Sequence, residues 1–148
     1  MSRTRAAVLA LALGASVVAG GYGAAAARAG ATDTPVLGPG LVTIHVDIRY
    51  SHFSLDHDHV RAGTLVRFVV RNRDVINHEF VVGPPSVHAL HAHGTERSHP
   101  PVPGEVSVAP HDTGETILRF DRAGKVEYAC HLPGHLAYGM KGEITVVQ

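Results

Sequence analysis

The residue types best able to bind a metal ion are unusually distributed in this chain. Its 148 residues include 12 histidines, two methionines and a single cysteine, Cys130. One cysteine cannot form an internal disulfide, so Cys130 is either an inert buried thiol or a reactive or metal-ligating one. Soft thiolate and thioether sulfurs suit Cu(I), and imidazoles also accept Cu(II). The spacing of histidine and methionine around Cys130 therefore decides between these roles.

Cys130 begins a Cys-x4-His-x4-Met pattern that continues through His135 to Met140. At this composition, the chance of finding both partners at set offsets from the cysteine is roughly 0.001. Pro133 and Gly134 allow the intervening segment to fold back over the end of a strand. The pattern therefore predicts that thiolate, imidazole and thioether converge on one point. A buried structural cysteine with surface histidines and a core methionine is the alternative interpretation.

His78 is the best candidate for a further ligand from a different strand. It alternates with Phe80 and Val82, so all three side chains are expected to face the core at the start of a strand. Two imidazoles and one thiolate with a long axial thioether form the blue-copper arrangement. This donor set accepts both Cu(I) and Cu(II), which lowers the reorganisation needed for each electron. The set therefore predicts one-electron transfer.

The elements that must position these residues are expected to be short strands. Alternating apolar and polar residues predict strands at 41–48, 65–71, 78–82, 105–108, 116–120, 125–130 and 142–147. Residues 49–59 are expected to be irregular, with Phe53 and Leu55 contacting the core, and a long loop is expected to run to about Pro103. We find no convincing amphipathic helix and no internal repeat. About seven strands separated by turn residues predict an all-β antiparallel sandwich or barrel.

Residues 1–29 are expected to be a secretory signal peptide that forms no part of the fold. Arg3 and Arg5 precede an apolar run at 6–19, and the small-residue stretch that follows contains an A-x-A cleavage pattern at 27–29. An uncleaved membrane anchor is the alternative. We therefore expect a secreted, periplasmic or cell-surface protein without a membrane span after cleavage.

The composition excludes several classes of function. Thirteen basic residues balance thirteen acidic ones, which argues against nucleic-acid binding by bulk charge, and the low aromatic content of 5% argues against base stacking. No G-x-S-x-G, H-E-x-x-H or P-loop motif is present, so we expect no enzymatic activity. After the leader we expect a flexible lead-in at 30–40 and one domain at 41–148, present as a monomer.

These motifs resemble those of the cupredoxins, the plastocyanin and azurin superfamily. The likeness is to small bacterial copper proteins with Asn-His-Glu-Phe, here 77–80, and Tyr-x-Cys-His-x-Pro-Gly-His, here 128–135. It covers residues 41–148 and implies a Greek-key β-sandwich of about seven to eight strands. It also implies one type 1 (blue) copper near one end of the sandwich, held by His78, Cys130, His135 and Met140.

Two further features follow from the resemblance. In many plastocyanins and azurins an asparagine follows the first histidine ligand and helps tie the ligand loops together. Here Glu79 follows His78 and Asn77 precedes it, which leaves that role unassigned. In the family the second histidine usually serves as a surface electron port amid apolar residues, here Leu132, Pro133, Leu136, Ala137 and Tyr138.

Other histidines lie away from this motif. His-rich tracts commonly bind metal, so the loop containing His88, His91 and His93 predicts a second copper or zinc site with His88 and His91 as members. Solvated loop histidines are the alternative. His131 follows Cys130 as in multicopper oxidases, but Ala129 precedes Cys130 and the partner domain is lacking, so oxidase activity is not expected.

Two functions follow from these residues. The first is an exported electron carrier that passes single electrons between redox partner proteins. The alternative is a copper-handling protein (a chaperone, scavenger or resistance factor) that uses the same site plus the His-rich loop and exchanges copper with a delivery partner. The number of copper ions bound before and after loop His→Ala changes discriminates between them.

Overall fold

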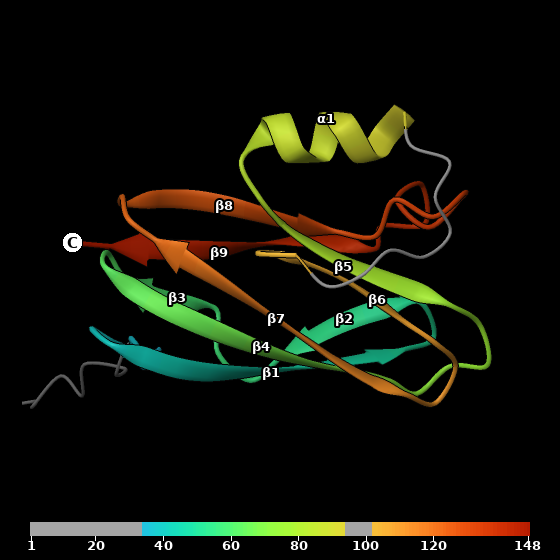
Figure 1. Cartoon of the computed structure of the whole chain (residues 1–148), viewed down its shortest axis with the longest axis horizontal. Coiled ribbons are helices and arrows are strands. Elements are labelled where there is room, and N and C mark those ends of the chain that lie inside the picture. The colour runs from blue at the N-terminus through green and yellow to red at the C-terminus, as the bar shows by residue number, and fades with distance from the viewer. Residues whose placement is uncertain (1–33, 94–101) are drawn as a thin grey trace, which may run out of the picture. The chain divides into compact units, whose positions relative to one another are not determined.

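The computed structural model describes residues 34–93 and 102–148, and in them two β-sheets face each other (Figure 1). The first sheet has the order β2-β1-β4-β7, formed by His52–Leu55, Leu41–Arg49, Thr64–Asn72 and Thr113–Phe120. The second has the order β3-β9-β8-β5-β6, formed by His59–Arg61, Lys141–Val147, Gly124–Ala129, His78–Gly83 and Glu105–Val108. Strands that are neighbours in space are often distant in sequence, as Greek-key crossovers require. The predicted all-β sandwich is confirmed.

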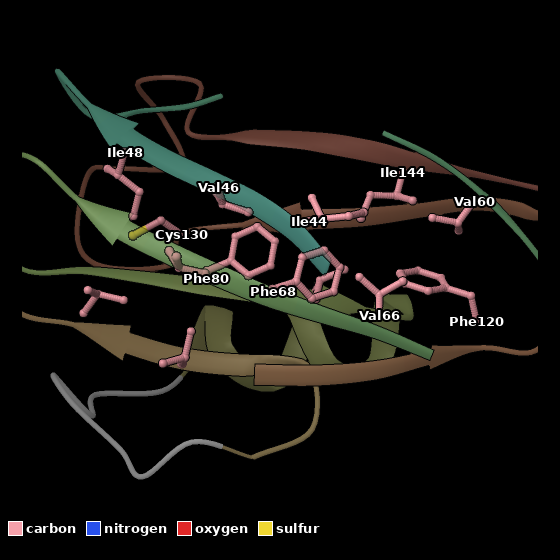
Figure 2. Close-up of a cluster of buried hydrophobic side chains, with 14 of the residues drawn as sticks. Ile44, Val46, Ile48, Val60, Val66, Phe68, Phe80, Phe120, Cys130 and Ile144 are labelled. Carbon is pink, nitrogen blue, oxygen red and sulfur yellow. The ribbon is translucent and has the colours of Figure 1, made fainter. Parts of the chain in front are cut away.

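Alternating side chains explain why the two sheets pack together. In β4, Val66, Phe68 and Val70 are buried while Arg67 and Arg71 are exposed. One face of the strand therefore joins the core and the other meets water. The ring of Phe68 lies in the middle of this core, with its centroid 5.1 Å from that of Phe80 and 6.3 Å from that of Phe120 (Figure 2).

The expectation of irregular structure at 49–59 is wrong, because β2 and β3 lie there. β1 and β2 form a hairpin in which Arg49 pairs with His52 and the two turn residues, Tyr50 and Ser51, have φ angles of 55° and 54°. Such turns are usually recognised by Asn-Gly or Asp-Gly, and Tyr-Ser carries no such signal. The expected contact of Phe53 with the core is confirmed, since it packs on Phe80.

A helix, α1 (Pro85–His93), occupies the first part of the segment that the sequence predicts to be a loop. It begins at a proline, which suits the first helical turn, and lies against the outer face of β5 (Figure 1). This cover explains why all six residues of β5 are buried. The helix escaped prediction because a histidine, His88, is buried on it while Leu90 is 75% exposed.

In the predicted lead-in, Leu37 forms two backbone hydrogen bonds to the segment around β3. Leu37 donates its N–H to the oxygen of His59 at 3.0 Å and accepts from the N–H of Arg61 at 2.8 Å. The predicted signal peptide lies outside the described residues. No helix in the described ranges has the length and apolar character that crossing a bilayer would need.

Candidate metal centre

Three of the predicted ligands meet at one end of the sandwich. The potential ligand atoms of His78, Cys130 and His135 all lie within 4.8 Å of one another. His78 begins β5, Cys130 directly follows β8, and His135 lies in the loop between β8 and β9. Figure 2 shows Cys130 at the end of the core that also holds Ile48, far from Phe120. Within residues 34–93 and 102–148 this is the one group of at least three His, Cys, Asp or Glu side chains compact enough to share an ion.

Backbone hydrogen bonds in the β8–β9 loop bring His135 back to Cys130. The N–H of His135 donates to the oxygen of Leu132 at 3.0 Å, and its ring nitrogen Nδ1 lies 3.2 Å from Cys130 Sγ. Gly134 has a φ of 87°, a conformation that glycine adopts without steric penalty. The ring of His135 lies 4.8 Å from that of His78, so the imidazoles flank the sulfur.

Met140 is held beside the other predicted ligands by its backbone. Its oxygen accepts from the N–H of Cys130 at 3.0 Å, and its N–H donates to the oxygen of His135 at 3.1 Å. The side chain is fully buried in the same core cluster as Cys130. A buried thioether in the same cluster as the cysteine suits the weak axial ligand of a type 1 copper.

His78 presents one ring nitrogen to the centre and the other to a carboxylate. Its Nε2 lies 3.0 Å from Asp74 Oδ2, while the buried Nδ1 has no hydrogen-bond partner among the described residues. An unpaired buried nitrogen is unfavourable unless something binds it, so the residues fit a metal ion. Burial lowers the pKa of His78, and Asp74 only partly opposes this effect, so the imidazole is neutral and its lone pair available at neutral pH.

The electrostatics at Cys130 favour a protonated thiol when no metal is bound. Burial raises the pKa of this thiol to about 11, against hydrogen bonds from the backbone of Glu79 and Leu132 that lower it. The charge of Glu79 raises the pKa further. A metal ion must therefore displace a proton from Cys130 before the sulfur can bind it.

Glu79 connects the strand of His78 to the loop of the other ligands. The N–H of His131 donates to Glu79 Oε1 at 2.6 Å, and Glu79 is only 3% exposed. The tie that an asparagine makes in many plastocyanins and azurins is thus made here by a carboxylate. The sequence offered one indication of this role, the position of Glu79 directly after His78. Because Glu stands there instead of Asn, the role could not be assigned from the sequence.

His88 and His91, the predicted members of a second metal site, each contact a residue that the prediction did not include. His88 Nδ1 lies 2.9 Å from Nε2 of His131, a residue that the sequence analysis set aside. His91 Nε2 lies 2.9 Å from Glu105 Oε2, and its ring centroid lies 5.8 Å from that of His131. We call His88, His91 and His131 the histidine cluster. One sequence feature indicated that this cluster lies near the first site: His131 directly follows Cys130.

Two other histidines of the described residues, His57 and His59, lie beside carboxylates, and the predicted port residues line the loop of His135. His57 lies 3.3 Å from Asp56, and His59 lies 2.7 Å from Asp58, at the sheet margin. On the loop that carries His135, Leu136 is 37% exposed and Tyr138 is 77% exposed. Of the other predicted port residues, Pro133 and Ala137 are exposed and Leu132 packs against the core.

A family model of copper binding proteins, the plastocyanin/azurin family, matches residues 42–147. The chain belongs to this family. Its metal is therefore copper, and the resemblance inferred from the motifs is confirmed.

The copper-resistant cuproprotein CopI of Rubrivivax gelatinosus is 44% identical over 92 residues, which cover 59% of this chain and 54% of that protein. CopI of Pseudomonas aeruginosa is 30% identical over 120 residues, covering 59% and 66%. The chain thus spans about half to two thirds of the length of these relatives.

Solved structures similar to this chain show the same fold. Auracyanin from Roseiflexus castenholzii has a TM-score of 0.57 at 20% identity, covering 72% of this chain and 97% of its own. Auracyanin A from Chloroflexus aurantiacus, a blue copper protein, has a TM-score of 0.55 at 22% identity, covering 72% and 99%. At these identities the likeness establishes the cupredoxin-like sandwich and nothing finer.

Proposed function

We propose that this chain is a copper-handling protein of copper resistance, which holds one type 1 copper and captures further copper at the histidine cluster. Relatives that share 30% to 44% identity with it are copper-resistant cuproproteins. The observation that carries the proposal is the position of the histidine cluster next to the first site. His131 directly follows Cys130 in the chain, and its ring contacts His88. A protein that only carries electrons needs the first site alone.

In the first site the proposed ligands are His78, Cys130, His135 and Met140. Copper bound there supplies a centre that alternates between Cu(II) and Cu(I). The chain's contribution is to bring two imidazoles and two sulfurs together before the metal arrives and to exclude water, since three of these residues are at most 1% exposed. Backbone hydrogen bonds join Met140 to Cys130 and to His135, which limits movement of these three ligands between the two oxidation states.

In the histidine cluster, one pair of ring nitrogens, from His88 and His131, is spaced to share a transition metal, although the three histidines are less compact than the first ligand set. Two nitrogen ligands about 2.0 Å from one tetrahedral ion lie about 3.3 Å apart. The 2.9 Å separation of His88 Nδ1 and His131 Nε2 needs only a small opening to accept an ion. Glu79 and Glu105 add carboxylates on the His91 side of the cluster, with oxygens 3.9 Å from Nδ1 and 2.9 Å from Nε2 of His91. Imidazole and carboxylate donors fit Cu(II) or Zn(II).

Metal stoichiometry tests the proposal. The full chain without its leader is loaded with copper, dialysed against a weak chelator and measured by elemental analysis. We expect more than one copper per chain, falling to one when His88 and His91 are both replaced by alanine. His45→Ala, which removes an exposed strand histidine, is the matched control and should leave the count unchanged. One copper per chain in every variant would refute the handling function.

The same proposal places the protein outside the cytoplasm, as an exported, periplasmic or cell-surface protein. Expression in a copper-sensitive bacterial host with an export leader should raise the copper concentration at which growth stops. The Cys130→Ala variant and the double variant of His88 and His91 should each lose part of this protection. Equal protection by a variant lacking both sites would show that copper binding is not its cause.

Electron transfer between partner proteins is the second candidate function. It is favoured by the enclosed ligand set and by the exposed apolar side chains of Leu136 and Tyr138 on the loop that carries His135. In this role the chain is a monomeric carrier without substrate chemistry of its own. Fast, reversible electron exchange together with a single copper per chain would favour this function over handling.

A further inference from the structure

Asp74, in the turn between β4 and β5, links three parts of the molecule through one carboxylate. Its Oδ1 accepts from the N–H of Tyr50 at 2.7 Å, and its Oδ2 accepts from the N–H of Ser51 at 2.8 Å. The same Oδ2 lies 3.0 Å from Nε2 of His78. The side chain is only 13% exposed, so these bonds are largely shielded from water.

We propose that Asp74 is the positioning residue of the copper site, which turns Nδ1 of His78 toward the metal and favours Cu(II) over Cu(I). This inference rests on the proposed role of His78 as a copper ligand. It concerns how the protein tunes the site, which neither family membership nor the relatives' names address.

The first step of the argument is the protonation state of the ring. A neutral imidazole carries one N–H, and an ionised carboxylate can only accept a hydrogen bond. The proton therefore sits on Nε2, facing Asp74, and the lone pair sits on Nδ1. That Nδ1 is the buried nitrogen without a partner. The two oxygens of Asp74 also accept from the N–H groups of Tyr50 and Ser51, which is the bonding pattern of an ionised carboxylate.

The second step concerns rigidity. Tyr50 and Ser51 both have positive φ angles, which are unfavourable for residues other than glycine. Asp74 satisfies both of their N–H groups, so the β1–β2 turn holds the carboxylate in place. The carboxylate in turn holds His78 at the start of β5. The orientation of a ligand in one sheet therefore depends on a turn in the other sheet.

The third step concerns charge. A carboxylate bonded to a ligating imidazole strengthens the electron donation of the ring and adds a negative charge near the metal. Both effects stabilise Cu(II) more than Cu(I). Replacing a charged acceptor by a neutral one should lower the preference for Cu(II) by about tenfold, which is about 59 mV for a one-electron couple.

Asp74→Asn is the central variant, and Asp47→Asn is its matched control. Asp47 lies in β1 and pairs with Arg73 at 2.7 Å, so its replacement also removes one negative charge beside this turn but leaves the bond to His78 intact. We expect a potential rise of about 59 mV for Asp74→Asn, a much smaller change for Asp47→Asn, and recovery in Asp74→Glu. Equal shifts in both Asn variants, or none in Asp74→Asn, would overturn the proposal.

Two further measurements distinguish a role of Asp74 at the copper site from a loss of turn stability and from a wrong assignment of the copper ligands. Asp74 accepts the two turn N–H groups with two separate oxygens, and Asn replaces one of these oxygens by an NH2 donor, so Asp74→Asn also weakens the turn. Adding Ser51→Gly, which relieves the positive φ, should restore stability but not the potential. In the metal-free protein, ¹⁵N NMR of His78 should show a proton on Nε2 in the wild type and a mixture of tautomers in Asp74→Ala. If His78 of the wild type carries its proton on Nδ1, this inference is wrong. If the proton is on Nε2 but the wild type does not bind copper, the proposed function is wrong instead.

Discussion

Copper binding should release close to one proton from Cys130 at mildly alkaline pH. Burial raises the pKa of this thiol to about 11. At pH 7.5 such a thiol is ionised in only about three molecules in 10,000, so removing its proton costs about 5 kcal/mol. Because the copper-bound sulfur is a thiolate, this free energy opposes binding at pH 7.5 and shrinks as the pH rises. The affinity for Cu(II) should therefore increase about tenfold per pH unit until the pH approaches the thiol pKa.

The proton count can be measured by titration calorimetry in several buffers of different ionisation enthalpy. At pH 8.5, free imidazoles are already neutral and release no proton on binding. Because burial lowers the pKa of His78, this imidazole is also neutral at pH 8.5 and releases no proton. The observed release should then be close to one per copper bound at the first site. The Cys130→Ala variant, measured in the same buffers, accounts for copper bound elsewhere and should release nearly none.

Two results would refute the reasoning. If Cys130→Ala released as many protons as the wild type, the protons would come from other groups. If the wild type released none and its affinity did not change between pH 7.5 and 9, the thiol would already be ionised without metal. Burial would then not govern its pKa, and the hydrogen bonds from the backbone of Glu79 and Leu132 would be the dominant influence.

Other changes test separate parts of the structure. Cys130→Ser should abolish the intense visible band that a thiolate gives with Cu(II), as an optical spectrum of the loaded protein would show; a persistent band would contradict the ligand assignment. Met140→Leu should keep copper and raise the reduction potential, measured by voltammetry, because a weak donor to Cu(II) is lost; a lower potential would exclude Met140 as the axial ligand. Glu79→Gln should lower the pKa of the Cys130 thiol, measured from thiolate absorbance in the metal-free protein, because the nearby negative charge is removed; an unchanged pKa would mean that the charge of Glu79 does not contribute to it. Phe68→Ala should reduce the free energy of unfolding by about 3–5 kcal/mol in urea titrations, because a fully buried ring is lost; a loss below about 1 kcal/mol would show that the core collapses around it.

Local periodicity accounts for the part of the fold that the sequence predicts well. Strands such as β4 and β6 alternate apolar and polar residues, and the structure places them within a residue of the predicted bounds. β2 and β3 were missed because they are only four and three residues long and are joined through turns without the usual signals. Helix α1 was missed because its buried face contains histidine, which no apolar pattern reports.

The sequence by itself determined the donors of the first site. Cys130, His135 and Met140 lie within eleven consecutive residues, so a single loop brings them together, and His78 follows from its alternation with Phe80. These are short-range relations, which spacing and parity express directly. Copper as the metal followed from the chemistry of the donors themselves.

Only the tertiary structure decided what surrounds those donors. His88 meets His131 across 43 positions of sequence, and Glu79 meets His131 across 52, because β5 and β8 are neighbours in the second sheet. Asp74 reaches Tyr50 across 24 positions because β1 and β4 are parallel neighbours in the first sheet, so the residues that follow them lie side by side. Pairings of this kind depend on the order of strands, and no local pattern records that order. The physical reason is that a side chain's own neighbours in sequence set its strand and face, whereas packing of distant strands sets its partners.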